Sequence, residues 1–265
     1  MLKIITKPSF LLSVITFLFF ALPIHTYNPD IELHKNRYNE NLFIDKPGIP
    51  DTHKAFILDL IPLIQHANQA VMQERERLQT IYSLVKNGKR IKHPEQQWLK
   101  KLEIKYHGKN NSYPLPKDPE KLLKYINELL SRVDMVPIRL AIAQSAIESG
   151  WGTSRFCVEG QAYFGIHCYK PGCGIKARLD DEGGFEVKSY KNAQESVDDY
   201  LLFLNSKRGM QSFRTERINY FHKDSIPDIQ KLAKSIKGYS GIGSSYHSMI
   251  ASILQNYIPE NIANN

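Results

Sequence analysis

Most of this sequence is patterned for α-helix, and proline and glycine residues mark where the helices start and stop. From Phe56 to Val85, apolar residues recur at the spacing of one helical face, and Pro62 within that run is expected to kink or split it. Gly88 ends the run. Further helices are predicted over residues 94–106, 118–132, 137–149, 192–204, 227–237 and 245–257.

One region of the chain favours β-structure. Two short β-prone pieces, 175–179 and 185–190, flank the turn residues Glu182, Gly183 and Gly184, which predicts a small hairpin. The sequence shows no internal repeat and no low-complexity run. We therefore predict an α+β fold that is mostly helical, with one small β-hairpin.

The N-terminus departs from the ordinary composition of the rest of the chain. Lys3 and Lys7 precede an apolar stretch from Phe10 to Ile24, the pattern of an export signal. No clean small-x-small cleavage site follows Ala21, so residues 1–25 are either a cleaved signal peptide or an anchor that associates with the membrane. Both interpretations predict an exported protein, in the periplasm or on the outer face of the cytoplasmic membrane.

The formal net charge of +8 suits an acidic polymer or an anionic membrane surface. The basic residues are dispersed rather than clustered with aromatics, which is also the pattern of a solvated surface. Export makes nucleic acid the least suitable partner, and no nucleic-acid binding is predicted.

The segment from Ala143 to Gly152 carries the clearest chemical signal, because it is a helix that ends in an acid. Glu148 would lie in the last turn, where the negative end of the helix dipole disfavours a carboxylate and raises its pKa. A neighbouring Trp151 would desolvate the carboxyl further. A carboxyl kept protonated by an apolar wall is what a glycosidase needs as its general acid. The alternative is an exposed helix-end residue, with Gly150 as a simple C-cap.

These residues belong to a wider pattern that resembles a known family. The runs AIESGWG at 146–152 and YFGI at 163–166, followed by Phe185, Tyr190 and Glu195, resemble the bacterial glucosaminidases, a family of cell-wall glycoside hydrolases that includes flagellar muramidase-like enzymes and autolysins. The pair Cys168 and Cys173, the run KGYS at 237–240 and the helical extension are similar to its Bax branch in Gram-negative bacteria. The resemblance covers roughly residues 55–260.

The resemblance implies a lysozyme-like fold and hydrolysis of peptidoglycan at N-acetylglucosamine, by an endo-β-N-acetylglucosaminidase that needs no cofactor. Glu148 matches the family's catalytic acid, and Tyr239 matches a tyrosine near the reacting sugar. The chain then divides into the signal or anchor, a linker (26–50), a helical extension (51–112) and a glucosaminidase-like catalytic domain (113–262). The alternatives are a lytic transglycosylase and a non-catalytic wall-binding or scaffold protein on the same fold.

Other candidate site residues follow from their place beside these motifs. Trp151, Tyr163, Phe164 and Tyr246 are candidates for contact with the glycan strand, although aromatics at such positions are as often core residues. The family usually carries a second carboxylate on the hairpin. Here the candidates are Asp180, Asp181, Glu182 and Glu186, and none matches cleanly.

The three cysteines leave two interpretations. With His167, the set Cys157, Cys168 and Cys173 could formally hold zinc. In an oxidising compartment a Cys168–Cys173 disulfide that pins the loop is simpler, with Cys157 left buried or unpaired. We therefore predict the disulfide and no metal.

Overall fold

The structure is a computed structural model that describes residues 40–108, 114–176, 184–222, 228–236, 239 and 243–262. The predicted signal or anchor and most of the linker lie outside the described residues. Within the described ranges, no helix is both long and apolar enough to span a membrane. The helices in chain order are η1 (Glu40–Phe43), α2 (Asp51–Lys86), α3 (His93–His107), α4 (Pro119–Arg132), α5 (Ile138–Ser149), α6 (Arg155–Gly160), α7 (Ala193–Ser206), η3 (Arg208–Met210), α8 (Gln211–His222), α9 (Ile229–Lys234) and α10 (Ser244–Asn256).

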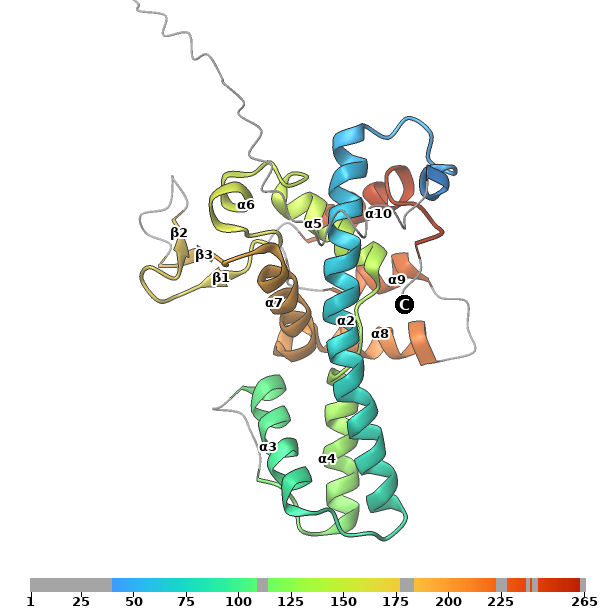
Figure 1. The fold of residues 1–265 in the computed structure, drawn as a ribbon, viewed down its shortest axis with the longest axis vertical. Coiled ribbons are helices and arrows are strands. Elements are labelled where there is room, and N and C mark those ends of the chain that lie inside the picture. Colours follow the sequence, from blue (N-terminus) through green and yellow to red (C-terminus); the bar gives the residue numbers. More distant parts are fainter. Residues whose placement is uncertain are drawn as a thin grey trace, which may run out of the picture.

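Helix α2 runs the length of the molecule (Figure 1) and contacts α4, α5 and α7. The prediction that Pro62 could split this helix is wrong, because the helix continues through it. A proline removes one backbone hydrogen bond, but Ile57, Ile61 and Ile64 on the buried face are each 0% exposed. The packing of that face holds the helix together on both sides of the proline.

Helix α5 lies at the centre of the fold, between α2 and α10. It is buried on nearly every side: Leu140, Ile142 and Ala143 are 0% exposed although they point in different directions around the helix. Gly150 ends it in the left-handed conformation, as the sequence predicts. A rigid, fully packed helix therefore carries the candidate acid in its last turn.

The small sheet has three strands, one more than the predicted hairpin. Strand β3 (Glu186–Lys188) lies between β1 (His167–Cys168) and β2 (Gly174–Ile175), and both neighbours are antiparallel to it. Strand β1 is two residues long, too short to leave an alternating pattern in the sequence. The sheet lies to one side of the helices, next to α6 and α7 (Figure 1).

Two α-helices of the described chain, α6 and α8, were not predicted from the sequence. In α8, two of the three buried residues are arginines, Arg214 and Arg217, so the buried face leaves no apolar periodicity. Arg217 is fully buried because carbonyls at the end of α4 accept its hydrogen bonds, among them Ser131 O at 3.1 Å and Arg132 O at 2.9 Å. Helix α6 is only six residues long and begins at a Ser154 cap.

The buried apolar side chains form one cluster that includes Leu42 near the start of the described chain and Ile262 near its end. Residues of α2 and α3 share this core with residues of α5, α7 and α10. The helices predicted as an extension therefore pack against the predicted catalytic unit. The observed fold is mostly helical with a small antiparallel sheet, which confirms the α+β class.

Candidate active site

Glu148 lies one residue before the end of α5, and an unusual turn follows it. Gly150, Trp151 and Gly152 all have positive φ, at 56°, 57° and 81°. For a tryptophan this conformation costs roughly 1–2 kcal/mol. Hydrogen bonds to α5 hold the turn, including Trp151 N to Ala146 O at 2.9 Å and Gly152 N to Ser149 Oγ at 2.8 Å. Backbone strain of this kind persists only where the surrounding structure enforces it, and it is found most often at functional sites.

Two opposing effects set the pKa of Glu148. Burial is the larger and raises the pKa, while a hydrogen bond with the Tyr246 side chain lowers it. The net pKa is above the ordinary value of a glutamate, in the direction predicted from the sequence. Among the described residues, no carboxylate contributes to this shift.

A chain of buried hydrogen bonds ends at Glu148. The Tyr200 hydroxyl donates to Gln144 Oε1 at 2.7 Å, and Gln144 Nε2 donates to the Tyr246 hydroxyl oxygen at 2.9 Å. Because the amide nitrogen of Gln144 can only donate, the Tyr246 oxygen is the acceptor in that bond, and its own proton is left to reach the Glu148 carboxyl. Tyr246 therefore acts as a donor that stabilises the carboxylate.

Sequence reasoning missed Gln144 and Tyr200 in this chain. Gln144 precedes Glu148 by four residues, so both lie on one face of α5. A glutamine inside an otherwise apolar helix was the available signal, because a buried amide must find hydrogen-bonding partners. Tyr200 left no such signal, since its partner comes from a helix distant in the sequence.

Tyr246 also offers a test of the Glu148 assignment. A general acid must be protonated, so activity falls as pH rises through its pKa. Replacing Tyr246 by Phe removes a donor to the carboxylate, which disfavours the charged form and raises that pKa. We expect the alkaline limb of the pH–activity profile of Tyr246→Phe to move to higher pH.

The phenols of Tyr200 and Tyr239 also interact with Glu148. Burial raises the pKa of both, so they stay neutral over the pH range in which Glu148 titrates and cannot produce the limb themselves. The matched control is Tyr82→Phe on α2, which should leave the profile in place. An unmoved limb in Tyr246→Phe would contradict the role of Tyr246 as the donor to the acid.

Tyr239 lies beside this chain of hydrogen bonds. Its ring is nearly parallel to that of Tyr246, with centroids 6.0 Å apart, and its hydroxyl donates to Phe164 O at 2.9 Å. Burial is the main cause that raises its pKa, so the phenol stays neutral. Its proton is engaged by the backbone, and its oxygen keeps a lone pair for another donor.

Gly165 lies next to the carboxyl group of Glu148. A Cβ atom at this position would come within 3.2 Å of Glu148 Oε2, and the residue has a φ of +59°. We expect Gly165→Ala to lose most of its activity, because the methyl group would displace the carboxyl, in addition to a loss of roughly 1 kcal/mol of stability from the φ alone. Activity assays and thermal unfolding measure the two effects separately.

Gly88→Ala is the control for this variant, because Gly88 has a φ of +72° and open space around its Cβ position. It should lose stability and keep its activity. Equal activity losses in the two variants would mean that strain, and not contact with Glu148, explains the effect of Gly165→Ala.

The aromatic residues predicted to contact glycan lie in different surroundings. Phe164 is 1% exposed and stacks on Tyr200 at 3.8 Å, and Tyr246 is 2% exposed, so neither ring has a face open to a sugar. For these two residues the structure corrects the prediction of direct contact. Tyr163 is half-buried; its phenol hydrogen-bonds to the Cys157 thiol.

Trp151 was expected to form the wall of the Glu148 carboxyl, but its ring is engaged by α2. It stacks on His53 with centroids 3.8 Å apart and meets the edges of Phe56 and Tyr257. The first turns of α2 therefore brace the strained turn after Glu148. Sequence analysis could not find this contact, because Trp151 lies about a hundred residues after its partners on α2.

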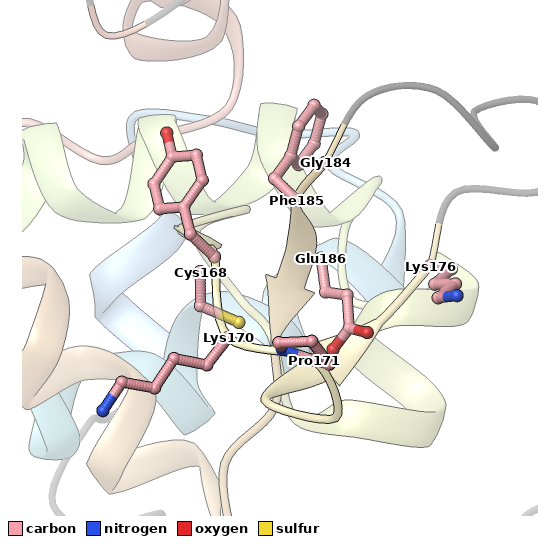
Figure 2. Close-up of a pocket in the computed structure, with 8 residues that line it drawn as sticks. Cys168, Lys170, Pro171, Lys176, Gly184, Phe185 and Glu186 are labelled. Atoms are coloured by element: carbon pink, nitrogen blue, oxygen red, sulfur yellow. The ribbon is translucent and has the colours of Figure 1, made fainter.

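Of the four hairpin acids, Asp180, Asp181 and Glu182 lie outside the described residues. Glu186 is buried, and its carboxylate accepts hydrogen bonds from Gly172 N at 3.1 Å and Gly174 N at 2.8 Å. These backbone donors hold its pKa below the ordinary value. Figure 2 shows this carboxylate turned toward Pro171. Both residues line a hollow of about 180 Å³ beside the sheet, and Glu148 does not line it. The contacts give Glu186 a structural task in this turn.

The same turn is closed by a disulfide between Cys168 and Cys173, with Cα atoms 6.2 Å apart. Cys157 is buried and free. Ligand atoms of Cys168, Cys173 and Glu186 lie within 4.8 Å of one another. With the two sulfurs bonded to each other, however, no thiolate pair is left to bind a metal.

The sequence of the chain matches the model of a known family. The profile described as mannosyl-glycoprotein endo-beta-N-acetylglucosaminidase, the Glucosaminidase family, matches residues 123–258, more than half of the chain. The chain therefore belongs to the glucosaminidase family, as its sequence motifs predict.

A comparison with curated proteins points to the same branch that the sequence resembles. Protein bax of Escherichia coli (strain K12) is 28% identical over 216 residues, which cover 76% of this chain and 68% of that protein. No solved structure matches the chain.

Proposed function

We propose that this protein is an exported peptidoglycan hydrolase that cleaves the glycan strand at N-acetylglucosamine, with Glu148 as the general acid. Membership of the glucosaminidase family supports a peptidoglycan-related glycosidase. The observation that carries the finer assignment is the carboxyl of Glu148, which is buried at a helix end and has a raised pKa. In a lysozyme-like arrangement the polymer lies between the helices and the small sheet.

In the proposed reaction, protonated Glu148 gives its proton to the oxygen that bridges two sugars, and the bond from that oxygen to the anomeric carbon breaks. The carboxylate that remains keeps the hydrogen bond from Tyr246, which stabilises it as the proton leaves. Water then adds to the anomeric carbon, and Glu148 recovers a proton from that water. The two opposing effects on its pKa suit a group that must both give and regain a proton.

Tyr239 suits a role toward the sugar that the hydrogen-bond pattern makes specific. Its hydroxyl donates a hydrogen bond to Phe164 O, so toward a ligand its oxygen can only accept. The N–H of an acetamido group is a matching donor. Held in this way, the acetamido carbonyl oxygen could attack the anomeric carbon, as in substrate-assisted glycosidases that need no protein nucleophile.

A lytic transglycosylase is the second candidate, because an acid in the last turn of a helix, as Glu148 is here, also suits that reaction. Such an enzyme also needs one acid, but the 6-hydroxyl of the muramyl sugar attacks in place of water. Mass spectrometry of purified peptidoglycan after digestion distinguishes the two. Hydrolysis at N-acetylglucosamine gives products with that sugar at a free reducing end, whereas the lyase gives anhydro-muramyl ends lighter by one water.

A third outcome of the same experiment concerns a wall-binding or scaffold protein. Sedimentation with peptidoglycan but no new ends in the digest would assign that role and overturn the enzymatic proposal. Export is tested by fractionating cells that make the full chain: we expect the protein outside the cytoplasm, and a purely cytoplasmic protein would contradict it.

A further inference from the structure

A cavity of about 760 Å³, whose lining includes none of the candidate active-site residues, opens where four helices meet. It lies between the last turns of α3, α4 and α7 and the first turns of α8, in the region where the α3–α4 part joins the rest of the fold (Figure 1). Five cationic side chains line it. They are Lys105, Arg132, Lys207, Arg208 and Arg214.

The carboxylates near this cavity are already shared. Glu74 pairs with Lys105, and Glu128 pairs with both Arg132 and His107. Lys207 and Arg208 are exposed, and neither forms an ion pair with any carboxylate in the described part of the chain. The cavity therefore holds more positive charge than the protein itself neutralises.

The arginines at the back of the cavity have a local task that uses only part of their hydrogen-bonding capacity. Arg214 is 4% exposed and donates from Nη1 to Leu204 O and Lys207 O, while Arg132 donates from Nη1 to Ser206 O. These bonds cap the end of α7. Among the described residues, Nη2 of neither arginine donates to a protein acceptor, so each guanidinium keeps donors for a further partner.

The positive charges of Arg132 and Arg214 at the back of the cavity repel each other. Burial, and then the charge of Arg132, lower the pKa of Arg214 to about 10, while the charge of Glu128 acts in the opposite direction. Holding these two guanidiniums together therefore costs the protein stability, and a bound anion would offset that cost.

We propose that this cavity is a binding site for a phosphate group. Cations approach it from α3, α4, the α7–η3 junction and α8, and a phosphate presents three oxygens in different directions with close to two charges. A carboxylate presents two oxygens in one plane and one charge. The side-chain amide of Gln211 also lines the cavity and adds a neutral donor, while the Thr215 hydroxyl donates to Gln211 O at 3.1 Å. The phosphate is either the end group of a soluble oligophosphate or the phosphomonoester headgroup of phosphatidic acid, since both have three free oxygens.

The test uses the full-length purified chain, with inorganic pyrophosphate as probe in titration calorimetry at low salt. We expect one site per chain, and a loss of affinity of at least about tenfold in Lys207→Gln/Arg208→Gln, since two charge-assisted contacts are removed. The matched control is Lys89→Gln/Arg90→Gln, an exposed lysine–arginine pair away from this cavity that changes the net charge equally.

A second arm identifies the source of the phosphate by sedimentation with vesicles of phosphatidylcholine that either contain or lack phosphatidic acid. Binding only to the vesicles with phosphatidic acid, lost in the 207/208 variant and reduced by pyrophosphate, assigns a lipid headgroup. Binding of pyrophosphate without binding of vesicles assigns a soluble ligand. Equal losses in the 207/208 and 89/90 variants would reduce the effect to general charge and overturn the proposal, as would no binding in either arm.

Discussion

The Glu148→Gln protein is expected to lose peptidoglycan cleavage by about 10²–10⁴-fold, because an amide keeps the shape of the side chain and cannot give a proton. The new amide can still accept the hydrogen bond from Tyr246, so the chain from Tyr200 through Gln144 stays intact. The measurement is the rate at which soluble fragments appear from purified peptidoglycan. The binding of the variant to peptidoglycan should be unchanged.

Thermal unfolding provides the control for this variant, and the sign of the effect follows from the raised pKa. The folded protein holds Glu148 protonated to higher pH than the unfolded chain does, so the cost of a buried carboxylate is absent at low pH. That cost appears as pH rises through the folded pKa. The amide in Glu148→Gln never ionises, so at neutral pH the variant should be at least as stable as the parent protein. A folded variant with more than about a tenth of the parent activity would mean that Glu148 is not the general acid.

Glu148 could be proposed as the acid from the sequence because every signal for it is local. The helix through Ala146, the stop at Gly150 and the family's motif are all within a few residues of Glu148. The surroundings of the acid could not be found in this way. Tyr200 and His53 reach the site from α7 and from the start of α2, and only the tertiary fold brings them there.

The same distinction separates the helices that were predicted from those that were missed. Helix α4 is indicated by the Asp118 cap, whose carboxylate accepts from Lys121 N at 2.9 Å, and by apolar residues at helical spacing. Helix α8 buries Arg217 where an aliphatic residue would be expected. That burial is possible because carbonyls at the end of α4 accept hydrogen bonds from its guanidinium, and only the assembled fold brings these carbonyls to it.

Glu186 is a residue whose position was predicted correctly and whose role the sequence left open. Glu186 stands on the predicted strand, but its carboxylate is occupied by Gly172 N and Gly174 N. Nothing in the spacing of the residues indicates these bonds, since the partners lie across the turn that the Cys168–Cys173 disulfide closes.

Replacing Tyr239 by Phe is expected to impair cleavage severely, mainly through kcat. The change removes the donor to Phe164 O, next to Gly165 at the acid, and removes the oxygen that would accept the acetamido N–H.

The single replacements Asp180→Ala, Asp181→Ala, Glu182→Ala and Glu186→Ala should each leave substantial activity. For Glu186 we expect a loss of thermal stability in addition, because the N–H groups of Gly172 and Gly174 lose their acceptor, and Glu186→Gln should restore part of it.

The kinetic comparison separates two interpretations of Tyr239. If the residue only holds the Phe164 carbonyl in place, Tyr239→Phe should cost as much with a substrate whose acetamido nitrogen is methylated as with the unmodified substrate. If the Tyr239 oxygen accepts the acetamido N–H, the penalty should shrink for the methylated substrate, which lacks that N–H and keeps the carbonyl oxygen. A hairpin acid as indispensable as Glu148 would overturn both interpretations, because the enzyme would then use two carboxylates with that residue as its base or nucleophile.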